Sequence, residues 1–259
     1  FATRITSRVA QQDVKVGKQV LVKVGDVITS EIAAAIDKAG VTEVIVRSPL
    51  TCQSPKGMCA KCYGWDFSTR AMVDIGVPVG IVAAQSIGEP GTQLTMRVKH
   101  SGGIVGLDVT QGLPRVEELL EARVPKSPAL VAEISGVAHI VTDEDGTVVT
   151  IKSTGQPVDE RSYAIPNPQA LIVADGQLVA AGSALTAGSM DPHEILAVRG
   201  LQSAQEYILQ QVQAVYESQG IPIHDKHFEV TLRKMGDKLQ IESAGDTEFL
   251  TGEVIERAR

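Results

Sequence analysis

The sequence predicts an α+β protein made of several parts: small β-barrel or sandwich-hybrid modules, a cysteine-bearing turn and a helical hairpin. Residues 14–29 and 128–190 alternate apolar and polar side chains between glycine turns, which is typical of short strands. Residues 113–123 and 201–218 instead carry apolar side chains at helical spacing. Strands and helices thus fall in separate stretches of the chain.

The first expected part, residues 1–74, is rich in β structure and ends after the cysteines. Its strands over 14–29 are followed by a brief helix over 31–40, for which Ser30 is a plausible N-cap. Residues 41–48 then predict a strand that leads into the cysteine cluster.

The second expected part, residues 75–126, is a helical hairpin. A helix begins in the small, apolar segment 78–87, and Pro90 and Gly91 mark a kink or joint after it. The second helix lies in 113–123, with a proline in its first turn.

The last two expected parts are a β barrel–sandwich hybrid module over 127–192 and a C-terminal part over 193–259. Turn signals separate short alternating strands in the module. In the C-terminal part, a helix over 201–218 precedes a strand over 227–235 and a charged tail.

Composition excludes several functional classes. The chain has 259 residues, a formal net charge of −7 and 3% aromatic residues, which argues against a free-standing nucleic-acid binder and against base-stacking platforms. Residues 1–100 hold 12 basic and 8 acidic side chains (+4), whereas residues 101–259 hold 12 and 23 (−11). The first stretch could face a polyanion, and the second suits subunit contacts better. No segment approaches the ~20 apolar residues of a membrane span.

Three cysteines predict a metal site. Cys52, Cys59 and Cys62 lie within one short window, in a chain whose N-terminus lacks a signal-peptide layout. The Cys-x2-Cys turn can place two thiolates on one Zn²⁺. Structural zinc takes four ligands, so the fourth would come from outside this chain or from water. Together with the missing initiator Met, this hints at a piece of a longer chain; buried or redox-active thiols are the alternative.

The stretch QSIGEPGTQLTMRVKHSGG, residues 85–103, has glycines at both ends and reactive side chains between them. Glycines at both ends of such a segment predict that it moves and contacts another molecule or another part of the protein.

The chain resembles the β′ (largest) subunit of bacterial DNA-directed RNA polymerase in a series of motifs: CAKCYG, GIVAAQSIGEPGTQLTMR, DVTQGLPRVEELLEAR, VAEISG, DPHEIL and DKHFEV. The likeness covers nearly the whole chain and an internal portion of that subunit's C-terminal half. It implies that residues 85–123 correspond to the trigger loop, which folds into a helical hairpin against the bridge helix when the correct nucleoside triphosphate arrives.

The resemblance assigns four site residues. It implies that Gln93 reads the sugar of the nucleotide, that Met96 packs on its base and that Arg97 lies beside the triphosphate. His100 would approach the phosphates, either as a general acid or as a positioned donor.

One departure concerns the two residues before His100, where the family usually has Thr-Phe and this chain has Val98 and Lys99. The change removes an aromatic packing contact and adds a charge that could reach a phosphate.

The resemblance also implies cofactors and partners. In the family, the fourth cysteine of the second zinc site lies upstream of this segment, and so do the Mg²⁺-binding aspartates. The isolated chain is therefore expected to be inactive. The expected partners are the rest of β′, the β, α, ω and σ subunits, the NTP, the DNA template and the RNA–DNA hybrid. The expected location is the cytoplasm, at the nucleoid.

Two other functional classes stay open. The strand–glycine–strand pattern of 19–29 and 170–182 suits a lipoyl or biotin carrier domain, but Lys152 lacks the flanking residues of a modified lysine. A zinc-stabilised interaction module without catalytic role is the other alternative. The histidines of HDKH, residues 224–227, are interpreted as part of a structural turn.

Overall fold

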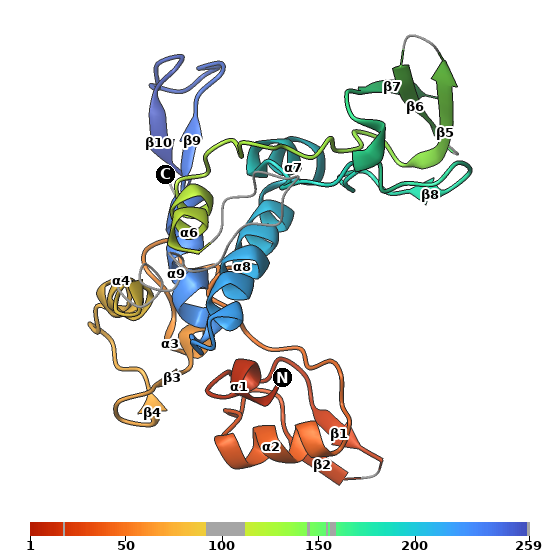
Figure 1. Ribbon diagram of the computed structural model, residues 1–259. Helices are drawn as coiled ribbons and strands as arrows, with labels where there is room; N and C mark the ends of the chain where they lie inside the picture. Colours follow the sequence, from red (N-terminus) through yellow and green to blue (C-terminus); the bar gives the residue numbers. More distant parts are fainter. Residues whose placement is uncertain (18, 92–111, 144–145, 154, 156–158, 258–259) are drawn as a thin grey trace. The chain divides into compact units, whose positions relative to one another are not determined.

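A computed structural model describes residues 1–17, 19–91, 112–143, 146–153, 155 and 159–257. These residues form two compact units, and the chain passes between the units after Pro90 and after Ile221. Figure 1 labels the elements of both units. The α+β prediction is confirmed.

The first unit combines the N-terminal 90 residues with residues 222–259. Its elements are α1 (Ala2–Ile5), β1 (Val14–Val16), β2 (Gln19–Val22), α2 (Ser30–Lys38), α3 (Ala60–Tyr63), β3 (Trp65–Asp66), β4 (Ala71–Met72), α4 (Val79–Gly88), α9 (Asp225–Met235), β9 (Lys238–Gln240) and β10 (Val254–Glu256).

The N-terminal core of this unit forms where α2 covers the antiparallel β1–β2 hairpin. Apolar side chains from both layers and from the segment between them are buried there, and Ile28 of that segment and Ile36 of α2 are fully enclosed. The side chain of Thr29, and not Ser30, caps α2 by accepting a hydrogen bond from the Ile32 N–H at 3.3 Å. The strand predicted over 41–48 is reduced to one isolated bridge between Ala10 and Val46.

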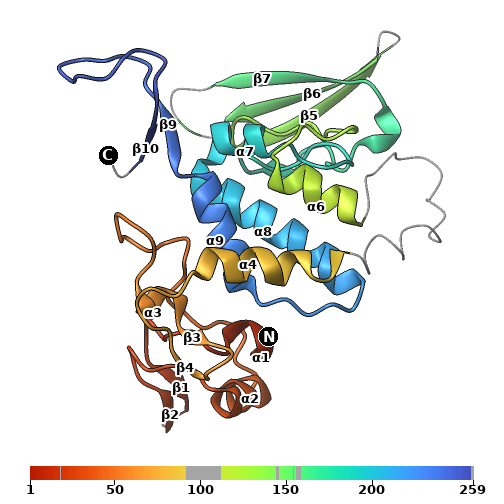
Figure 2. The ribbon, with the colours of Figure 1, turned by 90° about the vertical axis from the view of Figure 1, so that its left-hand side faces the viewer.

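Helix α9 corrects the predicted strand over 227–235. The segment is helical from Asp225 to Met235, and His224 caps it by accepting a hydrogen bond from the Lys226 N–H. It packs against α4, and the two helices lie side by side in Figure 2. The charged tail that follows forms the antiparallel hairpin of β9 and β10.

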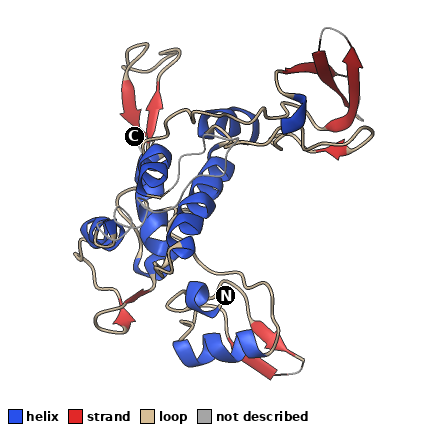
Figure 3. Ribbon diagram, in the orientation of Figure 1, coloured by secondary structure: helices blue, strands red, loops and turns tan. Residues whose placement is uncertain are grey.

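The second unit runs from Gly91 to Ile221. Its described elements are α6 (Leu113–Leu120), β5 (Gly136–Asp143), β6 (Gly146–Ser153), β7 (Glu160–Ile165), the 3₁₀ helix η1 (Pro168–Ala170), β8 (Leu178–Val179), α7 (Pro192–Arg199) and α8 (Leu201–Ser218). Figure 3 shows that strands and helices gather in separate portions of this unit.

The strands form one antiparallel sheet of order β7-β6-β5-β8, with the hairpin register Asp143↔Gly146 between β5 and β6. One face of the sheet buries a core that includes Val149, Ile151 and Leu185. Lys152 lies inside β6, where its Nζ pairs with Glu160 at 3.7 Å, and not at a hairpin tip as a carrier domain requires.

Two of the three α-helices described in this unit, α6 and α8, were predicted from the sequence, and α7 was not. Helix α8 spans the expected 201–218, and α6 and α7 both pack on it. Arg115 of α6 pairs with Glu118, both buried, and donates to the Tyr207 hydroxyl of α8 at 3.3 Å. The hydroxyl in turn donates to the Met190 carbonyl oxygen at 3.1 Å, so these polar groups fix α6 on α8.

Within the described ranges, none of the helices is long and apolar enough to cross a membrane. The division of the chain at 74, 126 and 192 stays a prediction.

Candidate metal centre

The three cysteines meet in the first unit. Cys59 immediately precedes α3 and Cys62 lies in it, and the three Sγ atoms lie within 4.8 Å of one another. Zn–S bonds of 2.3 Å in a tetrahedron place sulfurs about 3.8 Å apart, so a small contraction would suit zinc. Across the described part of the chain, this is the one group of three His, Cys, Asp or Glu residues placed to hold a metal ion.

Local hydrogen bonds form the turn. The Cys62 N–H donates to the Cys59 carbonyl oxygen at 3.1 Å, and the Cys59 N–H donates to Cys52 Sγ at 3.4 Å. N–H···S bonds of this kind stabilise a thiolate or a metal-bound sulfur. The backbone therefore prepares the cluster for a negatively charged, ligating state.

Arg47 was not among the residues predicted from the sequence. Its Nη2 donates to Cys62 Sγ at 3.3 Å and to Cys59 Sγ at 3.7 Å. Burial raises the pKa of Cys59, but hydrogen bonds from Cys62 and Arg47 outweigh burial and lower that pKa to about 7. Burial and the hydrogen bond with Cys59 raise the pKa of Cys62 to about 12, against the opposing effect of Arg47.

These features fit a thiophilic ion. Cys52 and Cys62 are buried, and three soft thiols with N–H donors around them match the ligand chemistry of Zn²⁺. The Nε of Arg47 is buried without a hydrogen-bond partner. The three cysteines could therefore hold a metal ion, with a guanidinium beside two of the sulfurs.

Gly64 allows the cysteine turn to lie close to the N-terminal segment. Its φ is +83°, and a Cβ on Gly64 would lie 2.0 Å from the Ser7 carbonyl oxygen. That same oxygen accepts a hydrogen bond from the Trp65 N–H at 3.0 Å. A side chain at position 64 would break this contact.

Helix α9 supports the turn with a buried cation. Lys226 is fully buried, and its Nζ donates to the Trp65 carbonyl oxygen at 2.8 Å. The Nζ lies 4.6 Å from the Tyr63 ring centroid and 4.3 Å from that of Phe67. Burial, together with the positive charge of Arg8, lowers the pKa of Lys226 to about 7.

The same helix face contains a buried ion pair. Arg8 donates to both carboxylate oxygens of Glu229, at 2.6 and 2.8 Å. His224 Nε2 donates to the Thr6 carbonyl oxygen at 2.9 Å, and burial lowers the pKa of His224 to about 2. His227 is also buried, which lowers its pKa to about 4. The HDKH histidines are thus neutral and structural, as predicted, but they belong to the start of α9 and not to a turn.

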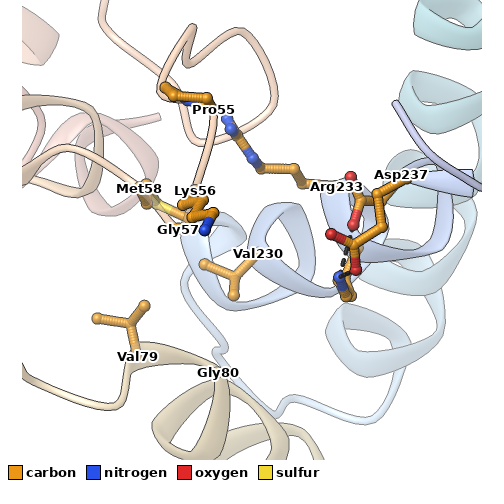
Figure 4. Close-up of a pocket in the computed structure, with 11 residues that line it drawn as sticks. Pro55, Lys56, Gly57, Met58, Val79, Gly80, Val230, Arg233 and Asp237 are labelled. Carbon is orange, nitrogen blue, oxygen red and sulfur yellow. Dashed lines mark hydrogen bonds and ion pairs between the residues drawn. The ribbon is translucent and has the colours of Figure 1, made fainter. Parts of the chain in front are cut away.

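A cavity of about 380 Å³ lies between the loop that follows Cys52, the start of α4 and the end of α9. Figure 4 shows Met58, Val79 and Val230 among its apolar lining residues, with Arg233 and Asp237 at its polar side. Lys234 also lines the cavity, where it pairs with Asp237.

The catalytic candidates Gln93, Met96, Arg97 and His100 lie outside the described residues, so their roles stay predictions. The helices on either side, α4 and α6, are described. His139 and His193 are exposed, and His193 Nε2 donates to the Ala122 carbonyl oxygen at 2.8 Å.

The fold and the cysteine cluster define a multi-part α+β protein with one candidate metal centre in its described part. The chain belongs to the family described as RNA polymerase Rpb1, domain 5, whose model matches residues 3–164 and 133–256. The resemblance found in the sequence is confirmed at this level.

Curated relatives agree with the family. The DNA-directed RNA polymerase subunit beta′ of Caldanaerobacter subterraneus subsp. tengcongensis is 49% identical over 99% of this chain. The proteins of the same name from Thermoanaerobacter sp. (strain X514) and Bifidobacterium adolescentis are each 48% identical, over 99% and 94% of the chain. The chain spans 22%, 22% and 18% of the length of these three relatives.

Proposed function

We propose that this chain forms part of the β′ subunit of a bacterial DNA-directed RNA polymerase and supplies its trigger loop. The observation that carries the proposal is the family match, which extends from residue 3 to residue 256 and includes the segment QLTMRVKH. The relatives named above are β′ subunits, which supports the same assignment.

In this proposal the segment 92–111 closes over the incoming NTP between two anchored helices. On its N-terminal side α4 packs on α9, and on its C-terminal side α6 is fixed by the Arg115 contacts to α8. Anchored ends allow a loop to fold reproducibly while its middle changes conformation.

The chemistry assigned to the loop is positioning and charge stabilisation. Gln93 and Met96 orient the sugar and base of the NTP, and Arg97 and His100 approach the triphosphate. Charge develops on the phosphate oxygens during nucleotidyl transfer, so donors brought close at that moment lower the barrier. His100 acts on the same atoms whether it donates a proton or only a hydrogen bond.

The metal of the cysteine cluster is proposed to be Zn²⁺ in a structural role. Cys52, Cys59 and Cys62 would hold it with a fourth ligand from another part of the subunit. The ion would fix the turn that precedes Trp65 and so stabilise the first unit.

The proposed partners are the rest of β′, the β, α, ω and σ subunits, and the template DNA with its RNA hybrid, in the cytoplasm. The excess of acidic side chains after residue 100 suits protein contacts better than DNA contacts. DNA contacts by this chain would be made to phosphates and would be independent of sequence.

Replacement of residues 92–111 by a short glycine–serine linker tests the proposal. The variant is assembled into polymerase, and the rate of single-nucleotide addition is measured at saturating NTP. We expect normal assembly and a rate at least about 100-fold lower, the effect of losing positioned donors. Assembly with an unchanged rate would refute the assignment of the loop.

A further inference from the structure

The three cysteines are held by two kinds of local structure. Cys59 and Cys62 lie on one short turn, in which the N–H groups of Cys62 and Tyr63 donate to the Cys59 carbonyl oxygen at 3.1 and 3.2 Å. Cys52 lies outside any helix or strand, in the irregular chain that precedes this turn. Apart from the bond between the Cys59 N–H and Cys52 Sγ, its position relative to the other two sulfurs depends on contacts to the loop that carries it.

Arg233 of α9 makes such contacts, although it lies 181 residues away in sequence. Its Nη1 donates to the carbonyl oxygens of Pro49 and Cys52 at 2.9 and 2.5 Å, and its Nη2 donates to that of Ser54 at 2.8 Å. Figure 4 shows the side chain reaching from α9 toward Pro55. One guanidinium thus binds three carbonyl oxygens of the loop that carries Cys52.

Both backbone polar groups of Cys52 form hydrogen bonds. Its N–H donates to the Pro49 carbonyl oxygen at 3.3 Å, and its own carbonyl oxygen accepts from Arg233. Three carbonyl dipoles converge on one cation, and without it they would repel one another. The planar fork of arginine presents its donors in fixed directions, which the compact ammonium of lysine cannot reproduce.

The nearby cavity offers another role for Arg233, as an anion-binding residue, but the hydrogen bonds argue against it. Three of the five N–H donors of Arg233 are directed at these carbonyl oxygens. The neighbouring Lys234 pairs with Asp237 at 2.5 Å and with Glu256 at 3.8 Å, so its charge is also balanced. The geometry favours a role toward the cysteine loop.

We propose that Arg233 is a positioning residue for the metal centre: by holding the backbone around Cys52, it determines how tightly the three-cysteine site retains its ion. The inference rests on the proposed binding of Zn²⁺ to the cluster. The contacts of Arg233 also couple the two ends of the first unit. An ion that orders Cys52 favours the docking of α9, and the docking of α9 favours ion binding by the same free energy.

The test is a chelator competition that measures the Zn²⁺ dissociation constant of the cysteine site in the β′ subunit that contains this chain, so that the proposed fourth ligand is present. Arg233→Met keeps the length of the side chain and removes its donors, and Arg233→Lys keeps the charge. Loss of a group that orients a ligand typically weakens metal binding 10–100-fold, so we expect a loss of about this size for Arg233→Met and a smaller one for Arg233→Lys. Lys234→Met, beside it on α9, is the control and should leave the constant unchanged within about twofold.

A double-mutant cycle separates positioning from general loss of structure. If Arg233 acts through Cys52, Arg233→Met should have no further effect on zinc affinity in a Cys52→Ser background. Bound Co²⁺ gives a second readout, since the thiolate-to-cobalt absorption of Arg233→Met should fall toward that of Cys52→Ser. If Arg233→Met does not fold, the comparison of Arg233→Lys with Lys234→Met decides the matter.

Three results would overturn the inference. Equal zinc affinity of wild type and both Arg233 variants would remove the role of Arg233 but leave the metal centre intact. Full additivity of Arg233→Met and Cys52→Ser would show that Arg233 acts elsewhere. A wild-type β′ subunit that binds no Zn²⁺ at Cys52, Cys59 and Cys62 would refute the proposed metal centre and, with it, this inference.

Discussion

The buried ion pair between Arg8 and Glu229 gives the sharpest prediction about stability. It joins the N-terminal segment to α9 across 221 residues of sequence, through two hydrogen bonds of 2.6 and 2.8 Å. The two side chains are 3% and 8% exposed, so water screens neither charge. Arg8→Met removes the guanidinium and leaves a carboxylate in a nearly dry site.

The expected cost follows from this geometry. Removing one partner of a buried ion pair typically destabilises a protein by about 3–5 kcal/mol, because the other charge is left uncompensated. Lys226 remains close enough to Glu229 to interact electrostatically, which favours the lower end of that range. The double variant Arg8→Met/Glu229→Leu removes both charges, together with the buried Arg8 Nε that lacks a hydrogen-bond partner. It should recover most of the loss.

The assay is urea unfolding of the 259-residue chain followed by tryptophan fluorescence. Trp65 is the single tryptophan of the sequence, and its backbone N–H contacts the Ser7 carbonyl oxygen beside Arg8, so its emission reports the first unit. Lys238→Met is the control, because its pair with Glu256 at 3.2 Å joins two half-exposed side chains. Such a pair contributes about 1 kcal/mol or less.

A cost for Arg8→Met no larger than that of Lys238→Met would refute this reasoning. It would mean that Glu229 is solvated or protonated in the folded protein. A double variant as unstable as Arg8→Met would place the cost in lost packing instead of the unpaired charge.

Two further predictions concern the neighbours of this pair. Burial lowers the pKa of Lys226 from 10.5 to about 7, so between these pH values the unfolded chain binds one proton more than the folded chain. The free energy of unfolding should therefore rise with pH across that window. The rise should reach at most about 2–3 kcal/mol at pH 9 and vanish in Lys226→Met, as measured by urea unfolding at pH 6.5 and pH 9; an equal rise in the variant would assign it to other groups. Gly64→Ala should lower the melting temperature more than Gly76→Ala, because both glycines have positive φ but only the added Cβ at 64 meets backbone, 2.0 Å from the Ser7 oxygen. Equal shifts would show that the close contact with Ser7 costs nothing.

Local patterns in the sequence predicted much of the secondary structure. Helix α8 has the bounds expected from its apolar spacing, and α6 begins at the expected Pro114 turn. The β5–β6 hairpin forms within the range 127–192 where short alternating strands were predicted. These elements follow from neighbours in sequence, which is why they could be found.

Helix α9 could not be recognised in the same way. Its buried face includes Lys226, His227 and Glu229, which a reading of apolar spacing counts as solvent-exposed. Glu229 is paired by Arg8 and Lys226 donates to the Trp65 carbonyl oxygen, so both depend on partners that are distant in sequence. Helix α7 was not predicted, although Asp191 and Pro192 form an N-cap signal at its start.

Only the ligands of the candidate metal centre could be predicted from the sequence. Cysteine spacing identified Cys52, Cys59 and Cys62, and the structure brings the three together. Arg47 and Arg233 carry no sequence signal of their own, since their contacts depend on how distant segments dock. The groups that orient the ligands therefore emerge only with the tertiary structure.

The central claim is that the glycine-flanked segment acts on the incoming NTP, and His100→Ala tests it most directly. Single-nucleotide addition is measured at saturating NTP with assembled polymerase, beside wild type and a Lys99→Ala control. We predict normal assembly, a rate reduced by about tenfold or more for His100→Ala, and a smaller effect for Lys99→Ala. An unchanged rate for His100→Ala, in a polymerase that assembles normally, would contradict the claim.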